Sequence, residues 1–253
     1  MKTKSIGIID SGLGGYTIFK ALRDKYPEVS FTLLADQKNN PFGSKSVEQL
    51  ELIGSRMVDQ LLERNINEVI VACNTLNANV MDYLETKYPQ VSFYGVIDKT
   101  VESLPKKCKT ILILATEATA KSHAYQNAIT KVNSQAWVDE LAAPQLVDLI
   151  EGLADDVDID AMLEDLLASR NKVDAIVMGC THFPIIAENI RKFSKASLVT
   201  SIEPMIQLIA EMKELPQGNS YVFTTYDPVR MANQIETLFN EKIFVDYLEG
   251  EAV

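Results

Sequence analysis

Ala175-Ile-Val-Met-Gly-Cys-Thr-His182 is a short apolar run that ends in a cysteine, a threonine and a histidine. An earlier stretch, Val69-Ile-Val-Ala-Cys-Asn-Thr75, has the same build. Such runs are typical of buried strands in α/β sheets, where ligands gather at the carboxyl ends of the strands. Two of the three cysteines of the chain occupy this repeated context. We therefore expect the thiols of Cys73 and Cys180 to face each other across one ligand.

The composition narrows the class of protein and of partner. The 253 residues are 47% hydrophobic and 23% charged, which is ordinary for a globular chain with one large domain or two of about 100–150 residues. The net charge of −11 disfavours nucleic acid and anionic membranes as partners, because both require a basic surface. A small anionic or zwitterionic ligand is still possible, since local groups decide the chemistry of a pocket.

The chain carries no pattern of a secreted, membrane or metal-binding protein. No stretch approaches the roughly 18 apolar residues of a membrane span, and the N-terminal apolar run is too short for a signal peptide. Three cysteines without a C-x-x-C pair indicate neither a disulfide framework nor a usual zinc site. The prediction is a cytoplasmic protein with reduced thiols and no metal.

Strand and helix patterns alternate along the whole chain. Strands are predicted at residues 5–10, 29–35, 69–73, 91–97, 109–114, 136–138, 175–179, 197–201 and 221–224. Helices are predicted at residues 17–25, 44–63, 74–87, 120–129, 147–153, 161–170, 184–193, 203–212 and 227–240. The candidate N-caps are Ser44 or Ser46 for the second helix, and Asp160 or a neighbour for the helix at 161–170. This alternation predicts an α/β fold with two parallel sheets, built from a duplicated unit. In that duplication Asp10-Ser11 corresponds to Ala115-Thr116, and Cys73 to Cys180.

A glycine-rich turn, Ser11-Gly-Leu-Gly-Gly-Tyr16, follows the first strand. Its glycines allow a ligand to approach the backbone, and the start of the next helix offers free N–H groups to a carboxylate or phosphate. The turn lacks the third glycine of a dinucleotide-binding fingerprint. A plain strand–helix turn is the alternative interpretation.

Two opposed thiols are suited to inverting a stereocentre next to a carboxylate. One group must remove a proton from one face of the carbon while another returns a proton to the opposite face. A thiol can act as acid or base once its pKa is lowered towards neutrality. His182 is the candidate helper for Cys180, and Asp10 is the candidate helper for Cys73, although a plain carboxylate raises a thiol pKa.

Each of these residues also has a purely structural interpretation. A cysteine at the end of a buried strand is usually a small core residue. His182 could be a core histidine, and Asp10 could cap a helix. Cys108, among three lysines, is not at a strand end and has no counterpart, so it is interpreted as a structural or a surface cysteine.

Several segments together resemble one known family. Ile6-Gly-Ile-Ile-Asp-Ser-Gly-Leu-Gly-Gly15, Asp36 with Pro41-Phe-Gly43, Ala72-Cys-Asn-Thr75 and Gly179-Cys-Thr-His-Phe-Pro184 are similar to motifs of the cofactor-independent glutamate racemases, within the aspartate/glutamate racemase superfamily. The two cysteine motifs together are specific. The resemblance implies interconversion of L- and D-glutamate without cofactor or metal. It also implies a supply of D-glutamate for peptidoglycan, and hence for the cell wall and cell shape.

The resemblance further implies an architecture and a set of site residues. We expect two similar α/β domains, residues 1–97 with 208–253 and residues 98–207, an active site in the cleft between them, and a homodimer. Cys73 and Cys180 would be the catalytic acid/base pair, assisted by Asp10 and His182. The residues expected around the glutamate are Asp10, Ser11, Phe42, Gly43, Asn74, Thr75, Thr181 and His182, with Glu151, Thr116 and Thr119 behind them.

Two departures from the family pattern leave the substrate open. The usual arginine before Pro-Tyr-Gly is Asn39 or Asn40, and the tyrosine is Phe42, which lacks a hydrogen-bonding hydroxyl. A racemase for aspartate or another acidic amino acid is therefore an alternative. A thiol hydrolase or decarboxylase would need only one cysteine, and a non-catalytic amino acid-binding protein would need neither.

Overall fold

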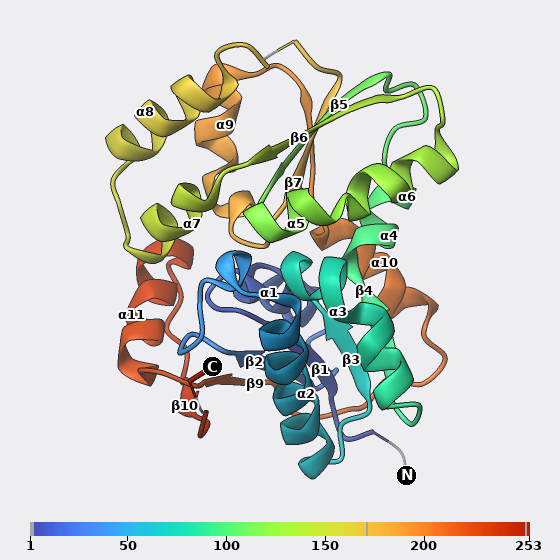
Figure 1. Cartoon of the computed structure of the whole chain (residues 1–253). Helices are drawn as coiled ribbons and strands as arrows, with labels where there is room; N and C mark the ends of the chain where they lie inside the picture. The colour runs from blue at the N-terminus through green and yellow to red at the C-terminus, as the bar shows by residue number, and fades with distance from the viewer. Residues whose placement is uncertain (1–2, 171, 251) are drawn as a thin grey trace.

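The computed structural model describes residues 3–170, 172–250 and 252–253, and it contains two parallel sheets covered by helices (Figure 1). The larger sheet holds β1 (Ile6–Asp10), β2 (Phe31–Ala35), β3 (Glu68–Val71), β4 (Ser92–Gly95), β9 (Tyr221–Thr224) and β10 (Asp246–Tyr247). The smaller sheet holds β5 (Thr110–Ala115), β6 (Trp137–Ala142), β7 (Ala175–Gly179) and β8 (Ser197–Val199).

The helices occupy the connections between these strands. They are α1 (Gly15–Lys25), α2 (Val47–Glu63), α3 (Asn74–Lys87), α4 (Val96–Glu102), α5 (Glu117–Ser122), α6 (Ala124–Val132), α7 (Pro144–Glu151), α8 (Asp156–Leu167), α9 (Ala187–Phe193), α10 (Ile202–Glu211) and α11 (Pro228–Phe239), with short 3₁₀ helices η1 (Phe42–Ser44) and η2 (Phe183–Ile186). Among the described helices, none combines the length and the apolar character that crossing a bilayer requires.

The two sheets share one strand order, which confirms the predicted duplication. The larger sheet runs β10-β9-β2-β1-β3-β4 and the smaller one β6-β5-β7-β8, so β2-β1-β3-β4 corresponds to β6-β5-β7-β8. Asp10 at the end of β1 pairs with Ala35, and Ala115 at the end of β5 pairs with Gly179. Because all these pairings are parallel, each sheet has its polar strand ends along one edge.

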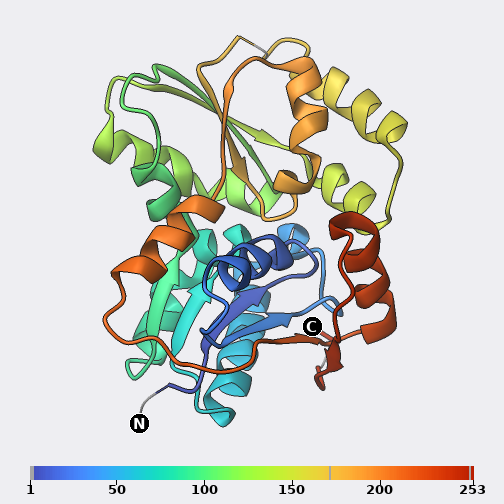
Figure 2. The same ribbon diagram turned by 180° about the vertical axis from the view of Figure 1, so that it is seen from behind.

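Helices cover both faces of each sheet, because successive strand side chains point in opposite directions. On β1, Ile8 belongs to the same hydrophobic core as Phe19 of α1, while Ile9 belongs to a second core with Leu61 of α2. The first core continues into the smaller sheet through Ile113 of β5. α10 packs beside α1 across the back of the molecule (Figure 2). The two sheets are thus held together by apolar packing behind the strand ends.

Several element boundaries differ from the sequence prediction. The strand predicted at residues 91–97 ends at Gly95, and Val96 already begins α4. The helix predicted at residues 120–129 is two helices that meet at His123, whose φ of 53° is left-handed. The short strand predicted at 136–138 runs instead from Trp137 to Ala142 as an edge strand, with Trp137 exposed and the residues after it half-buried.

Local capping explains three more boundaries. Ser46, rather than Ser44, caps α2 through a capping box with Gln49. Asp155, a neighbour of Asp160 in the acidic stretch, accepts backbone N–H bonds, so α8 begins at Asp156, five residues before the predicted start. α7 begins at Pro144, three residues before the predicted start, because proline suits the first helical turn.

The division into domains stays a proposal. The strands of the larger sheet fall within residues 1–97 and 208–253, and those of the smaller sheet within 98–207. α4 and α10 span the proposed boundaries, so these two helices are where the chain passes between the sheets.

Candidate active site

Both sheets direct their central strand ends at one cavity. Its empty space, including the opening to solvent, is about 550 Å³. The lining residues are Ser11, Asn40, Pro41, Phe42, Gly43, Ser44, Cys73, Asn74, Thr75, Thr116, Glu117, Pro144, Val147, Asp148, Cys180, Thr181 and His182. The cavity therefore brings together Cys73, from the end of β3, and Cys180, from the end of β7, as the repeated motif predicts. Within the described part of the chain, no group of three or more His, Cys, Asp or Glu side chains is placed to hold a metal ion.

Cys73 is the N-cap residue of α3 and is almost completely buried. Burial, followed by the charge of Asp10, raises the pKa of its thiol to about 12. The backbone N–H groups of Leu76 and Thr75 act in the opposite direction, as expected at a helix N-terminus, but they do not outweigh burial. With this raised pKa, Cys73 is a neutral thiol at physiological pH.

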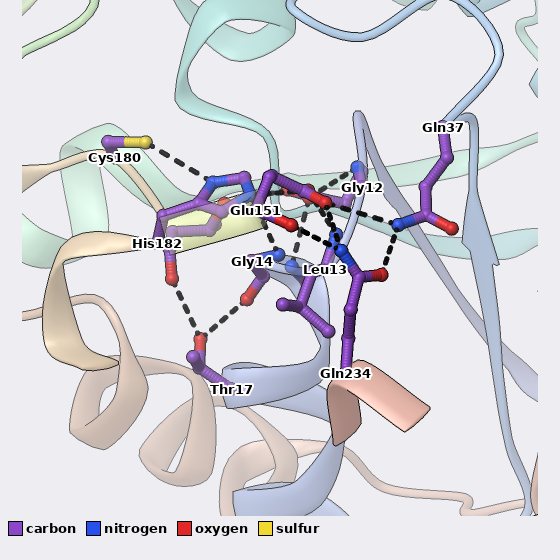
Figure 3. Close-up of polar contacts among 12 residues, drawn as sticks. Gly12, Leu13, Gly14, Thr17, Gln37, Glu151, Cys180, His182 and Gln234 are labelled. Carbon is purple, nitrogen blue, oxygen red and sulfur yellow. Dashed lines mark hydrogen bonds and ion pairs between the residues drawn. The ribbon is translucent and has the colours of Figure 1, made fainter. Parts of the chain in front are cut away.

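Cys180 lies at the start of a hydrogen-bonded chain that leads away from the cavity (Figure 3). Its sulfur is 3.6 Å from Nδ1 of His182, and Nε2 of His182 is 2.9 Å from Oε1 of Glu151. Burial lowers the pKa of His182, but the hydrogen bonds to Cys180 and Glu151 outweigh it and raise that pKa well above the ordinary value. The imidazole can therefore exchange a proton with the sulfur while Glu151 fixes its orientation.

Nε2 of His182 has a second neighbour, the backbone nitrogen of Gly14 at 3.2 Å. A ring nitrogen carries either a proton or a lone pair, so it can bond only one of these two groups. Burial raises the pKa of Glu151, but its contacts with His182, Leu13 and Gln234 outweigh burial and bring that pKa below the ordinary value. Because Glu151 is ionised, Nε2 of His182 carries a proton and donates a hydrogen bond to the carboxylate.

Asp10 lies beneath the cavity and does not line it, although the sequence predicts contact with the ligand. Its Oδ1 accepts from the backbone N–H groups of Gly12 and Gly15, and its Oδ2 accepts from the hydroxyl of Thr181 at 3.0 Å. Complete burial raises the pKa of the Asp10 carboxyl to about 6, while His182 and these hydrogen bonds oppose the rise. Asp10 thus acts on Cys73 by its charge.

The glycine-rich turn does not present free N–H groups to a ligand, which corrects the sequence prediction. Its amides at residues 12 and 15 donate to Asp10, the amide of Leu13 donates to Glu151, and that of Gly14 points at His182. α1 begins at Gly15 with Gly14 as its N-cap, so the amides of Gly12 and Leu13 belong to the turn before the helix and that of Gly15 to its first turn. The turn is an interface between the sheets.

Close packing explains why glycine occupies this turn. A Cβ on Gly14 would lie 2.3 Å from Oγ1 of Thr181 and 2.6 Å from Nδ1 of His182. A Cβ on Gly12 would lie 2.5 Å from Oε1 of Glu151. Contacts this short require the partners to move, and all three partners belong to the hydrogen-bonded network at the cavity.

Asn74 offers the cavity an unused donor. Its Oδ1 accepts from the hydroxyl of Tyr125 at 2.6 Å, whereas its buried Nδ2 has no hydrogen-bond partner. Buried amide groups are almost always paired, so an unpaired one beside a cavity indicates a ligand atom as partner. Tyr125, from α6 of the smaller sheet, fixes which end of the Asn74 amide faces the cavity.

Three threonine hydroxyls join the sheets on the other side of the cavity. Oγ1 of Thr75 is 2.9 Å from Oγ1 of Thr116 and 3.4 Å from that of Thr119. Thr116 lines the cavity and Thr119 lies behind it. Gly43 packs against Thr116, where a Cβ would lie 2.8 Å from the threonine Cβ.

The cavity lining includes most of the residues that the sequence predicts around the ligand. Ser11, Phe42 and Thr181 line the cavity as expected, whereas Glu151 reaches the second thiol only through His182. Sequence reasoning missed the hydrogen bonds of Gln37 and Gln234 to Glu151. Gln37 lies in the loop quoted for the resemblance, but Gln234 is one polar residue among many on α11.

Comparison with known proteins agrees with this geometry. The family model described as Asp/Glu/Hydantoin racemase matches residues 18–209, which include both cysteine motifs. The chain belongs to this family. A curated relative, glutamate racemase of Fusobacterium nucleatum, is 35% identical over 213 residues, which cover 82% of this chain and 79% of the relative. The resemblance inferred from the motifs is confirmed.

Solved structures agree with the assigned fold. Glutamate racemase from Thermus thermophilus, in complex with β-chloro-D-alanine, aligns with a TM-score of 0.84 at 26% identity, over 98% of each chain. The aspartate racemase of Picrophilus torridus aligns less well, with a TM-score of 0.55 at 18% identity over 95% of this chain and 96% of that one. The racemase family thus has the two-sheet α/β architecture found here.

Proposed function

We propose that this protein is a glutamate racemase that interconverts L- and D-glutamate by proton transfer between Cys73, Cys180 and the α-carbon. The observation that carries the proposal is that both thiols line one cavity, each from the strand end of a different sheet. Removal of a proton from one face and its return to the other require two acid/base groups, one on each side of the carbon.

The protonation of the site suggests where turnover begins. The raised pKa of Cys73 keeps its thiol protonated, so Cys73 is the acid for one enantiomer. For that enantiomer, the pair of Cys180 and His182 accepts the proton of the α-carbon, since the imidazole contacts the sulfur. The opposite enantiomer requires the reverse protonation, with Cys73 as base and Cys180 as acid.

Donors around the cavity would bind the carboxylates and stabilise the negative charge that develops when the α-proton leaves. The unpaired Nδ2 of Asn74 is one such donor, and the cavity-lining hydroxyls of Ser11 and Thr75 are others. The predicted contribution of Phe42 and Gly43 is through backbone N–H groups, because the phenylalanine has no hydroxyl.

Aspartate, or another acidic amino acid, is the second candidate substrate. The observation behind it is that the cavity is lined by Asn40 and Phe42, in the loop where the family has an arginine and a tyrosine. The closer structural match to a glutamate racemase than to an aspartate racemase favours glutamate.

A substrate panel tests the proposal. Incubation of L-glutamate in D₂O should give deuterium at the α-carbon by NMR, together with loss of the circular dichroism signal, and L-aspartate should react more slowly. A faster reaction with aspartate would select the second candidate. Binding without exchange would indicate a non-catalytic protein, and a covalent acyl-enzyme in the mass spectrum would indicate a thiol hydrolase.

The cellular part of the proposal is a supply of D-glutamate for peptidoglycan. It follows from the proposed reaction and from the family relationship. A homodimer and a cytoplasmic location stay predictions from the sequence. Sedimentation of the purified protein would test the first, and fractionation of the source cells would test the second.

A further inference from the structure

Glu151 is the meeting point of hydrogen bonds from four segments of the chain. Its Oε1 accepts from the backbone of Leu13 at 3.0 Å, besides His182. Its Oε2 accepts from Nε2 of Gln37 at 3.2 Å and from Nε2 of Gln234 at 3.1 Å (Figure 3). The Gln234 side chain is almost completely buried, so its amide must be satisfied within the protein.

The direction of these hydrogen bonds is fixed by groups that can play only one role. Nε2 of Gln234 also lies 2.7 Å from the backbone carbonyl of Glu151, which can only accept. Oε1 of Gln234 therefore faces Gln37, whose Nε2 donates to it at 3.1 Å. At the far end, the hydroxyl of Thr224 donates to Oε1 of Gln37 and accepts from the backbone of Tyr226. Neither amide can turn over without placing two donors or two acceptors together.

This arrangement leaves Glu151 as an acceptor towards every neighbour. A carboxylate that accepts several hydrogen bonds is favoured in its ionised form. His182 must then donate from Nε2, and its Nδ1 is left facing the sulfur of Cys180. The loop after β2 and helix α11 thus keep Nε2 of His182 protonated, while Nδ1 meets the thiol.

We propose that Gln234 and Gln37 are positioning residues that act on Cys180 through Glu151 and His182. The inference rests on the proposed two-thiol reaction and adds that these amides support one thiol only. Neither glutamine touches Cys73, which has its own neighbours in Asp10 and the start of α3.

Racemisation alone cannot locate this effect. The two enantiomers are equally stable, so kcat/KM must be equal in both directions for every variant. Elimination of HCl from the L- and D-forms of a β-chloro glutamate separates the thiols, because each enantiomer needs one base. That base removes the α-proton, the C–Cl electron pair leaves as chloride, and the enamine hydrolyses to 2-oxoglutarate and ammonia.

The experiment compares Gln234→Met and Gln37→Met with Gln126→Met, at an exposed position of α6. Loss of a hydrogen bond to a charged group should lower elimination from one enantiomer about tenfold or more. Elimination from the other enantiomer should stay within about twofold, and the control should retain both. The enantiomer affected should be the one whose elimination is lost in Cys180→Ser.

A spectroscopic readout is independent of turnover. The chain has only two histidines, so ¹⁵N-histidine labelling gives two imidazoles, with His123 as internal reference. In the parent protein Nε2 of His182 should give the signal of a protonated nitrogen. In Gln234→Met a lone-pair signal should grow at that nitrogen, while His123 is unchanged.

The outcomes separate the inference from the proposed function. The positioning role would be overturned if Gln37→Met lowered both eliminations equally, or neither, and left the His182 spectrum unchanged. The proposed racemase function would not be affected by that result. A parent protein that neither racemises nor eliminates would overturn the proposed function, and the His182 spectra would still decide whether the glutamines keep Nε2 of His182 protonated. If Gln234→Met fails to fold, the less buried Gln37→Met decides by the same criteria.

Discussion

The hydroxyl of Thr181 donates to the carboxylate of Asp10 at 3.0 Å, although the two residues are 171 positions apart. The bond joins the end of β1 to the turn after β7, directly beneath the cavity. It places a completely buried carboxylate between the two sheets, where its charge influences both Cys73 and His182. The relative placement of the sheets and the chemistry of the site thus depend on the same group.

Replacement of either thiol should abolish racemisation. Cys73→Ser and Cys180→Ser each remove one of two required acid/base groups, and a serine hydroxyl is far too weak an acid to replace a thiol. We expect racemisation of glutamate to fall by at least about 1,000-fold in each variant, measured by circular dichroism. Cys108→Ser is the control, because this buried cysteine does not line the cavity. Retention of racemisation in either cavity variant would refute the two-base scheme.

Stability should depend on the protonation of Asp10 between about pH 4 and pH 6. The pKa of its carboxyl rises from 3.8 to about 6 on folding, so the native state binds the proton more tightly than the unfolded state. The tighter proton binding stabilises the native state. This stabilisation is fully present below pH 3.8 and is lost as the pH rises through about 6. The full difference corresponds to about 3 kcal/mol.

Asp10→Asn removes this titration and retains a carbonyl oxygen for the amides of Gly12 and Gly15. The free energy of unfolding of the variant, minus that of the parent, should therefore increase from pH 4 to pH 7. Urea unfolding at several pH values measures this difference, in which groups common to both proteins cancel. Parallel curves across the range would show that Asp10 titrates normally.

The unpaired amide of Asn74 should matter for substrate binding. Asn74→Asp retains the acceptor for the hydroxyl of Tyr125 but replaces the donor Nδ2 with a negative oxygen. The loss of a hydrogen bond to a carboxylate should raise KM for glutamate about tenfold or more. Asn127→Asp, on the exposed surface of α6, changes the net charge equally and should leave KM unchanged. An unaltered KM in Asn74→Asp would mean that this amide does not meet the substrate.

Two glycine-to-alanine substitutions should have opposite effects on stability. In Gly14→Ala the new methyl group would overlap Thr181 and His182, so we expect a loss of about 2 kcal/mol. In Gly54→Ala, within helix α2, the methyl group meets only flexible leucine side-chain ends of α3, with Leu84 at 3.4 Å and Leu76 at 3.7 Å. Alanine should stabilise that helix by about 0.5–1 kcal/mol. Thermal unfolding of both variants measures the difference, and equal effects would contradict the packing at Gly14.

The sequence determined the parts of this protein that depend on local patterns. Apolar runs that end in polar residues predicted the parallel strands, and the repeat around Cys73 and Cys180 predicted two similar sheets with their thiols at strand ends. Because parallel strands expose their ends along one edge, this pattern places each thiol at a ligand-binding edge of its own sheet. That the two edges face one cavity also depends on how the sheets are placed relative to each other. These patterns do not specify where each helix begins, because capping by Ser46 or Asp155 depends on one side chain among several candidates.

The tertiary structure decided which polar groups meet. The glycine-rich turn has the composition of a ligand-binding loop, yet its N–H groups are consumed by Asp10 and Glu151 because the second sheet packs directly against it. Gln234 contacts Glu151, 83 positions away, only because α11 is placed beside α7. Such contacts leave no periodicity in the sequence, since they depend on the relative placement of two sheets and on the direction of each hydrogen bond.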